Sequence, residues 1–155
     1  MLVFLDNGVT NFEQPKLISL ALVAEDGREF YAERNDFREA DCSDFIQENA
    51  LPLLGRVPSS SCSRSELMRR LRAWLDNLEE PATLLFNYLG DWLLMQQACG
   101  GDNLQTNIGD KLQLGESAIC HPYFEQAQNE AFTQDWPPHH ALADARALKA
   151  GYQTW

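Results

Sequence analysis

The sequence lacks any apolar run of the roughly 20 residues that a membrane-spanning helix requires. Its opening residues, MLVFLDNG, also lack the basic segment and the cleavage site of a secretory signal peptide. These absences argue against a membrane-embedded class, so we expect a cytoplasmic protein with no membrane partner. The opening residues instead have the composition of a buried strand.

Paired cysteines are absent as well. The four cysteines are spread along the chain, and none forms a CxxC pair: Cys42, Cys62, Cys99 and Cys120. A structural zinc site needs ligands paired at short spacing, so the sequence gives little support for one. Without an export signal, we expect these thiols to be reduced.

Basic residues are few. The chain has 12 Lys and Arg against 23 Asp and Glu, which gives a net charge of −11 and an isoelectric point near 4.5. That balance argues against a protein that coats long nucleic acid by neutralising its phosphates. It is compatible with a small site in which bound divalent cations supply the positive charge.

The length of the chain and its apolar content predict a single domain over residues 1–155. Residues 2–6, 16–24 and 28–34 predict three consecutive strands, of which the last two are joined by the turn signal EDG. Strands joined by such short connections are expected to be antiparallel neighbours.

The rest of the chain alternates helices with strand. Ser63 and Glu66 have capping-box spacing ahead of an apolar helical stripe. Residues 82–88 predict a buried strand, and residues 90–99 and 141–152 predict helices. The whole order predicts an α/β fold with a mixed β-sheet, three antiparallel strands followed by α/β alternation, flanked by helices.

Four polar residues are candidates for a catalytic or metal-binding site. Asp6 ends the first predicted strand, and Asp91 follows the buried strand at the start of a helix. His139 precedes the last helix, and Asp144 lies in its first or second turn, so the two could face one cleft. Each also has an ordinary interpretation, as a turn aspartate, a helix N-terminal acid or an exposed histidine.

In this order the four residues resemble the DEDDh group of 3′–5′ exonucleases, which have a ribonuclease-H-like fold. The stretch HHALADA matches the last motif of that group, a histidine followed by an aspartate after four intervening residues, at His139 and Asp144. The similarity continues through LVFLD, LISLALVAEDG, FYAE and GDW. It is nearest to a compact bacterial group of 3′–5′ exoribonucleases.

The resemblance implies hydrolysis of phosphodiesters by a two-metal mechanism with Mg²⁺ or Mn²⁺. Asp6, Asp91 and Asp144 would be the metal ligands, since these hard cations prefer oxygen. His139 would be the general base, because it has the family spacing to Asp144 and His140 does not. The substrate would be the 3′ end of short single-stranded RNA or DNA, with RNA favoured, and the resemblance also implies a homodimer.

The family's first motif is incomplete in this chain. The nearest relatives usually read Asp-Thr-Glu-Phe-Thr, whereas this sequence reads DNGVT, from Asp6 to Thr10, with Gly8 at the glutamate position. That glutamate normally binds metal and the substrate's 3′ end, and its loss would lower the rate by ~100-fold or more. Either Glu13 supplies a carboxylate from five residues further on, or the site has one ligand fewer and binds one ion only.

Substrate contacts are expected from Thr10, which matches the motif, and from Phe12, whose ring could wedge against a base. Tyr88 and its neighbours Phe86 and Trp92 are either stacking residues or core residues. Two hypotheses therefore remain: a 3′–5′ exonuclease, or a catalytically impaired pseudo-exonuclease that binds nucleic acid or protein.

Overall fold

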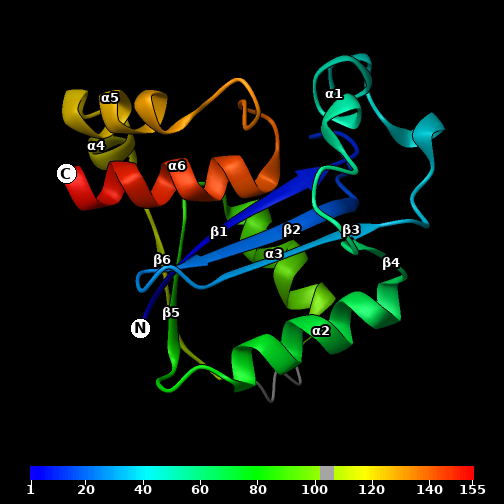
Figure 1. Cartoon of the computed structure of the whole chain (residues 1–155), viewed down its shortest axis with the longest axis horizontal. Coiled ribbons are helices and arrows are strands. Elements are labelled where there is room, and N and C mark those ends of the chain that lie inside the picture. The colour runs from blue at the N-terminus through cyan, green and yellow to red at the C-terminus, as the bar shows by residue number, and fades with distance from the viewer. Residues whose placement is uncertain (102–106) are drawn as a thin grey trace.

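The computed structural model describes residues 1–101 and 107–155, and its centre is a six-stranded mixed β-sheet (Figure 1). The strand order is β4-β3-β2-β1-β5-β6. Pairing is antiparallel for β1–β2 and β2–β3 and parallel for β1–β5, β5–β6 and β3–β4. The strands are β1 (Leu2–Val9), β2 (Leu17–Ala24), β3 (Glu29–Arg34), β4 (Ser61–Cys62), β5 (Ala82–Phe86) and β6 (Ile108–Gln113). The predicted three antiparallel strands and mixed sheet are confirmed.

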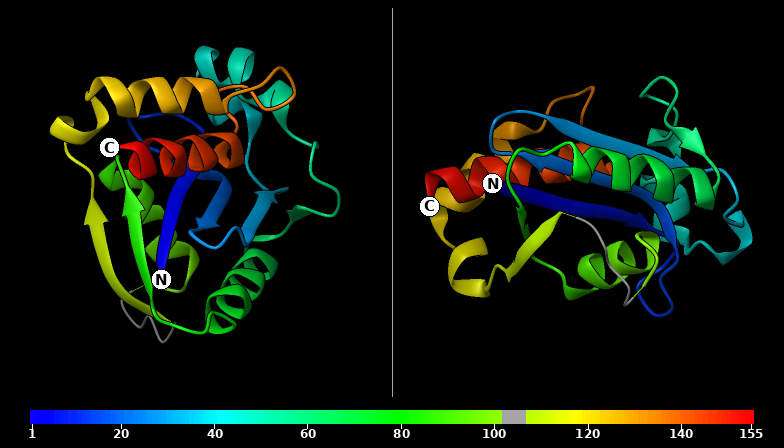
Figure 2. Two further views of the ribbon diagram at one scale, coloured as in Figure 1. Left: turned by 60° about the vertical axis from the view of Figure 1, so that its left-hand side comes forward. Right: turned by 90° about the horizontal axis from the view of Figure 1, so that it is seen from below.

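Helices cover both faces of the sheet (Figure 2). α2 and α3 pack on one face, and α5 and α6 pack on the other, with α6 lying along β1 and β2. α1 lies at the end of the sheet where β1 finishes (Figure 1). The helices are α1 (Asp44–Asn49), α2 (Arg64–Asp76), α3 (Leu89–Ala98), α4 (Glu116–Ile119), α5 (Pro122–Ala131) and α6 (Ala141–Thr154), with short 3₁₀ helices at Glu39–Asp41 and Leu51–Leu53.

The alternation of side chains along β1 decides toward which face of the sheet each residue points. Val3 and Leu5 belong to the core cluster with α2 and α3, whereas Phe4 packs with Phe124 of α5 and Leu148 of α6. Successive strand residues point to opposite faces. Asp6 is therefore expected on the face of Phe4, the face that α6 covers.

β1 is longer than the sequence predicted. Asp-Asn-Gly is strong turn chemistry, so the strand was expected to end at Asp6, but it continues to Val9. The pairing of β1 with β2 explains this, because Asp6, Asn7 and Gly8 sit in register with Ala21, Leu20 and Ser19. Tertiary pairing overrides the local turn preference.

Two helices, α1 and the predicted α2, are capped by serine. Ser43 Oγ accepts a hydrogen bond from Ile46 N, and Ser63 Oγ accepts one from Glu66 N. The second half of the capping box differs from the prediction, since the Glu66 carboxylate accepts hydrogen bonds from Arg69 and Arg70. Salt bridges within α2 thus replace the reciprocal bond.

Gly151 permits the close packing of α6 on α5. A Cβ built on Gly151 would lie 2.6 Å from the ring of Phe124, which is fully buried. We expect Gly151→Ala to lower the free energy of unfolding by ~1–3 kcal/mol, because overpacking outweighs the better helix propensity of alanine. Urea denaturation measures this. Gly115→Ala, where a Cβ meets nothing within 4 Å, is the control, and equal stability of both variants would contradict the expectation.

Two further features bear on the sequence predictions. Within residues 1–101 and 107–155, no helix is both long and apolar enough to cross a membrane. All four cysteines lie in these ranges as free thiols; Cys120 is exposed and the other three are buried.

Candidate active site

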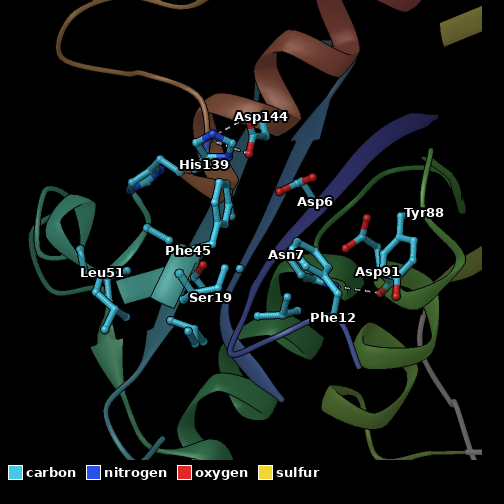
Figure 3. A pocket seen from close by; sticks show the side chains of 18 of the residues that line it. Asp6, Asn7, Phe12, Ser19, Phe45, Leu51, Tyr88, Asp91, His139 and Asp144 are labelled. Carbon is cyan, nitrogen blue, oxygen red and sulfur yellow. Dashed lines mark hydrogen bonds between the residues drawn. The ribbon is translucent and has the colours of Figure 1, made fainter. Parts of the chain in front are cut away.

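A pocket lies at the carboxyl end of β1, between α1 and the first turns of α3 and α6 (Figure 3). Its volume is about 860 Å³, part of which is open solvent. The predicted residues Asp6, Asp91, His139 and Asp144 all line it. Three segments that lie far apart in the sequence therefore bring these four side chains to one place.

Asp6 projects from β1 into the pocket. Figure 3 shows its carboxylate between that of Asp144 on α6 and that of Asp91 on α3. Burial raises the pKa of Asp6 well above its ordinary value, and the negative charges of Asp91 and Asp144 raise it further. The three acids thus form one electrostatically coupled group.

Asp91 enters the pocket from the first turn of α3 and is 4% exposed. Asn7 Nδ2 donates a hydrogen bond of 2.9 Å to the backbone oxygen of Asp91, which ties α3 to β1. Burial raises the pKa of the Asp91 carboxyl to about 7, although hydrogen bonding from Asn7 opposes the shift. A helix N-terminal acid on a solvated surface would not show this rise, so the ordinary interpretation does not fit Asp91.

Asp144 and His139 are linked through the backbone. The N–H of His139 donates to both carboxylate oxygens of Asp144, at 3.2 and 3.4 Å. His139 has a φ of 77°, in the left-handed region that non-glycine residues rarely adopt. Burial raises the pKa of Asp144 to about 6, and the bond from His139 opposes that rise. The four residues between His139 and Asp144 therefore set the spacing at which this hydrogen bond forms.

The two neighbouring histidines have different environments. The ring of His139 is exposed and meets the ring of Phe45 edge-on, with centroids 5.1 Å apart. His140 is 2% exposed and caps α6, since its Nδ1 accepts a hydrogen bond from Leu142 N. Burial lowers the pKa of His140 to about 4. His139 is thus the histidine that can exchange a proton with a ligand in the pocket.

Gly8 also lines the pocket, directly opposite Ser19 of β2. A Cβ at position 8 would lie 2.4 Å from Ser19 Oγ, which is far closer than real contacts allow. Ser19 is 3% exposed, so its hydroxyl fills the space in which a side chain at position 8 would begin. A side chain at position 8 would therefore require Ser19 to move or to be replaced.

The two residues predicted to bind substrate, Phe12 and Thr10, differ in whether they reach the pocket. Phe12 is 62% exposed and lines the pocket. Thr10 does not line it and is fully buried, because its hydroxyl accepts a hydrogen bond from Lys16 N and its backbone pairs with the same residue. The structure therefore places Thr10 in the β1–β2 loop that it closes, and not among the lining residues. Glu13 is exposed and is not among the lining residues, so it does not replace the missing carboxylate.

Aromatic rings surround the acidic floor of the pocket. Tyr88 and Phe45 are 43% and 45% exposed, and both line it. Phe86 and Trp92, the other two candidates for stacking, are 2% and 8% exposed and belong to the core. Exposed rings beside an acidic pocket offer flat surfaces for a nucleobase or another planar group.

Among the lining residues that were not predicted to belong to the site, three contact predicted ones: Ser19, Asn7 and Phe45. Ser19 had a signal, because it is the one polar residue in the strand LISLALVA. Asn7 adjoins Asp6 and was assigned to a turn. Phe45 had no local signal, since its contact with His139 depends on how α1 packs against the loop before α6.

The chemistry of the pocket suits a cation. Within the described ranges, Asp6, Asp91 and Asp144 form no salt bridge with Lys or Arg, so their charges are not neutralised by the protein. Asn7 Oδ1 is buried beside them without a hydrogen-bond donor. No three His, Cys, Asp or Glu side chains in that part of the chain are already gathered as an ion would need. A bound ion would therefore have to draw the carboxylates together.

When the chain is compared with protein-family models and with curated proteins, neither comparison finds a match.

Proposed function

We propose that this chain is a metal-dependent 3′–5′ exonuclease of the DEDDh type with a ribonuclease-H-like fold, acting on short single-stranded RNA. One observation carries the proposal: three carboxylates without basic partners share a pocket with the exposed ring of His139, Asp91 being buried and Asp6 and Asp144 half-buried. The mixed sheet, with three antiparallel strands followed by parallel ones, is compatible with the proposed fold. The motif resemblance of HHALADA supplies the rest of the argument.

Each side chain has a role in this proposal. Asp6, Asp91 and Asp144 would hold Mg²⁺ or Mn²⁺, because hard cations bind carboxylate oxygens and the pocket supplies no other positive charge. Such a cation supplies Lewis acidity at the phosphate and makes an attacking water more acidic. His139 accepts the proton of that water, since its ring is exposed and the Asp144 bond fixes its backbone.

The rim of the pocket would hold the nucleotide. Phe12, Phe45 and Tyr88 present exposed rings on which the terminal bases can stack, which is worth ~1–3 kcal/mol per base. Stacking tolerates any base, so we expect little sequence preference. An acidic surface around a small site also favours a strand end over a long duplex.

The direct test is digestion of 5′-labelled single-stranded RNA and DNA in Mg²⁺ and in Mn²⁺. We expect a ladder that shortens from the 3′ end, and we expect Asp144→Asn to reduce the rate by ~100-fold or more. Asp76→Asn, an exposed acid at the end of α2, is the matched control for the charge change. A ladder of equal intensity from Asp144→Asn would reveal a contaminating nuclease, and no ladder with either metal would reject catalysis by this chain.

The second candidate function is a binding module derived from such an enzyme. The fit of Ser19 Oγ against Gly8 favours it, because the space of the missing glutamate is already filled. This candidate predicts that labelled RNA binds and is released intact. Anisotropy of a labelled RNA together with gel analysis of the same sample separates the two functions.

A further inference from the structure

A second pocket lies near the same end of β2 and has the opposite charge character. Four of the chain's 12 basic residues line it, namely Lys16, Arg34, Arg38 and Arg64. Two acids, Asp36 and Asp41, line it as well. In a chain with 23 acids and a net charge of −11, a pocket with an excess of cationic side chains is a departure that calls for a ligand.

The acids do not neutralise the pocket. Asp41 pairs with Lys16 at 3.3 Å, and Asp36 pairs with Arg34. Arg38 and Arg64 are exposed, and in the described ranges their guanidinium groups take part in no hydrogen bond or salt bridge. Two unpaired guanidinium groups at one pocket form a site for an anion with several acceptor oxygens, such as a phosphate.

The helix α3 connects the two pockets. Asp91 lines the first, and Leu94 and Gln97, three and six residues later, line the second. At a rise of 1.5 Å per residue, these positions are about 4.5 and 9 Å further along the helix. The loop between β1 and β2 joins them too, since Phe12 lines the first pocket and Lys16 lines the second.

The pockets open beside β2 on opposite faces of the sheet. Leu17 lines the basic pocket and the next residue, Ile18, lines the acidic one. The β1–β2 register shifts at this point, so the packing decides the faces. Leu17 belongs to the core cluster of α2 and α3, whereas Ala141 and Asp144 of α6 line the acidic pocket. A ligand that occupies both pockets must therefore bend around the β1–β2 loop, which a flexible single strand can do and a stiff duplex cannot.

We propose that the basic pocket binds backbone phosphates of the same single strand whose 3′ end occupies the acidic pocket. Arg38 and Arg64 contact these phosphates, on the 5′ side of the terminal nucleotides. This inference rests on the proposed function, because it takes the strand end in the first pocket as given. It adds a length dependence: a strand that is long enough to reach both pockets binds more tightly than a dinucleotide.

The test compares two RNAs and two double variants. Anisotropy in Mg²⁺ follows a 5′-labelled 12-nucleotide RNA with non-hydrolysed phosphorothioate linkages, and an unlabelled dinucleotide of the same chemistry competes with it. We expect Arg38→Gln with Arg64→Gln to weaken binding of the longer RNA about tenfold and to reduce the slope of log K against log salt by about 1 to 1.5. Affinity for the dinucleotide should not change.

The control is Arg69→Gln with Arg72→Gln, which removes the same charge from α2 at positions that line neither pocket. If both double variants weaken the longer RNA equally, or if Arg38→Gln with Arg64→Gln weakens the dinucleotide as strongly, the basic pocket is not a phosphate site. If the unaltered protein binds neither RNA, the proposed function itself fails and this inference falls with it. The two failures are thus distinguishable.

Discussion

Under the proposed function, a glutamate placed at position 8 is expected to raise the rate of RNA digestion by ~100-fold or more, but only when Ser19 is changed as well. The alternation of β1 places position 8 on the face of Asp6, so a glutamate there would add a carboxylate to the acidic pocket. In the present chain, however, its Cβ would collide with Ser19 Oγ at 2.4 Å. With Ser19→Ala the nearest remaining side-chain atom is the Cβ at 3.6 Å, an ordinary contact.

The experiment is a double-mutant cycle of Gly8→Glu and Ser19→Ala, read by single-turnover digestion of 5′-labelled RNA and by urea denaturation. We expect Gly8→Glu alone to lower the free energy of unfolding by ~1–3 kcal/mol and to give little gain in rate. Ser19→Ala alone should leave the rate unchanged. The double variant should recover stability and gain activity, so the two positions should couple in both measurements.

Two outcomes would contradict this picture. If Gly8→Glu alone gives the full gain, Ser19 does not occupy the space of the missing side chain. If the double variant folds stably and remains inactive, the carboxylate at position 8 is not what limits the site, and the chain is a binding module.

Replacing Asp91 with asparagine is expected to stabilise the metal-free protein at pH 8, by at most about 4 kcal/mol. The pKa of Asp91 is about 7 in the folded chain against an ordinary 3.8, a rise of about three units. The folded state therefore binds more protons than the unfolded state between these two values. The free energy of unfolding then falls as the pH rises from about 4 to 7, and it is constant above that range.

Asp6 and Asp144 act in the same direction, because burial raises the pKa of both. His140 acts in the opposite direction, because burial lowers its pKa to about 4. Three raised carboxyl groups outweigh this one residue, so urea denaturation at pH 5 and pH 8 in EDTA should show greater stability at pH 5. Asp91→Asn should flatten this difference, whereas the exposed control Asp76→Asn should not. Greater stability at pH 8 than at pH 5 would contradict the burial of these charges.

Mg²⁺ or Mn²⁺ should reverse the pH effect in the unaltered chain. A cation that binds the folded state adds stability in proportion to its occupancy, about 2.7 kcal/mol at 100 times the dissociation constant. It binds ionised carboxylates, so its effect should be larger at pH 8 than at pH 5. An equal effect at both values would place the ion elsewhere on this acidic protein.

The local features of this molecule follow from the sequence, because neighbouring residues decide them. Ser63 caps its helix through a bond to a residue three positions later, and Gly27 provides the positive φ of the turn between β2 and β3. His139 and Asp144 contact each other across five positions, so the motif spacing alone locates one side of the site. Such interactions form within a turn or two of chain and need no knowledge of the distant parts.

Only the tertiary structure decided what these elements do together. The pairing of β1 with β2 turned a predicted turn at Asp6 into strand and set Gly8 against Ser19. Packing of α3 under β1 buried Asp91 and raised its pKa. Thr10 matched a motif, yet it is buried by the loop that it closes. Register, burial and the field of distant charges depend on contacts between remote segments, and a sequence pattern contains no direct measure of them.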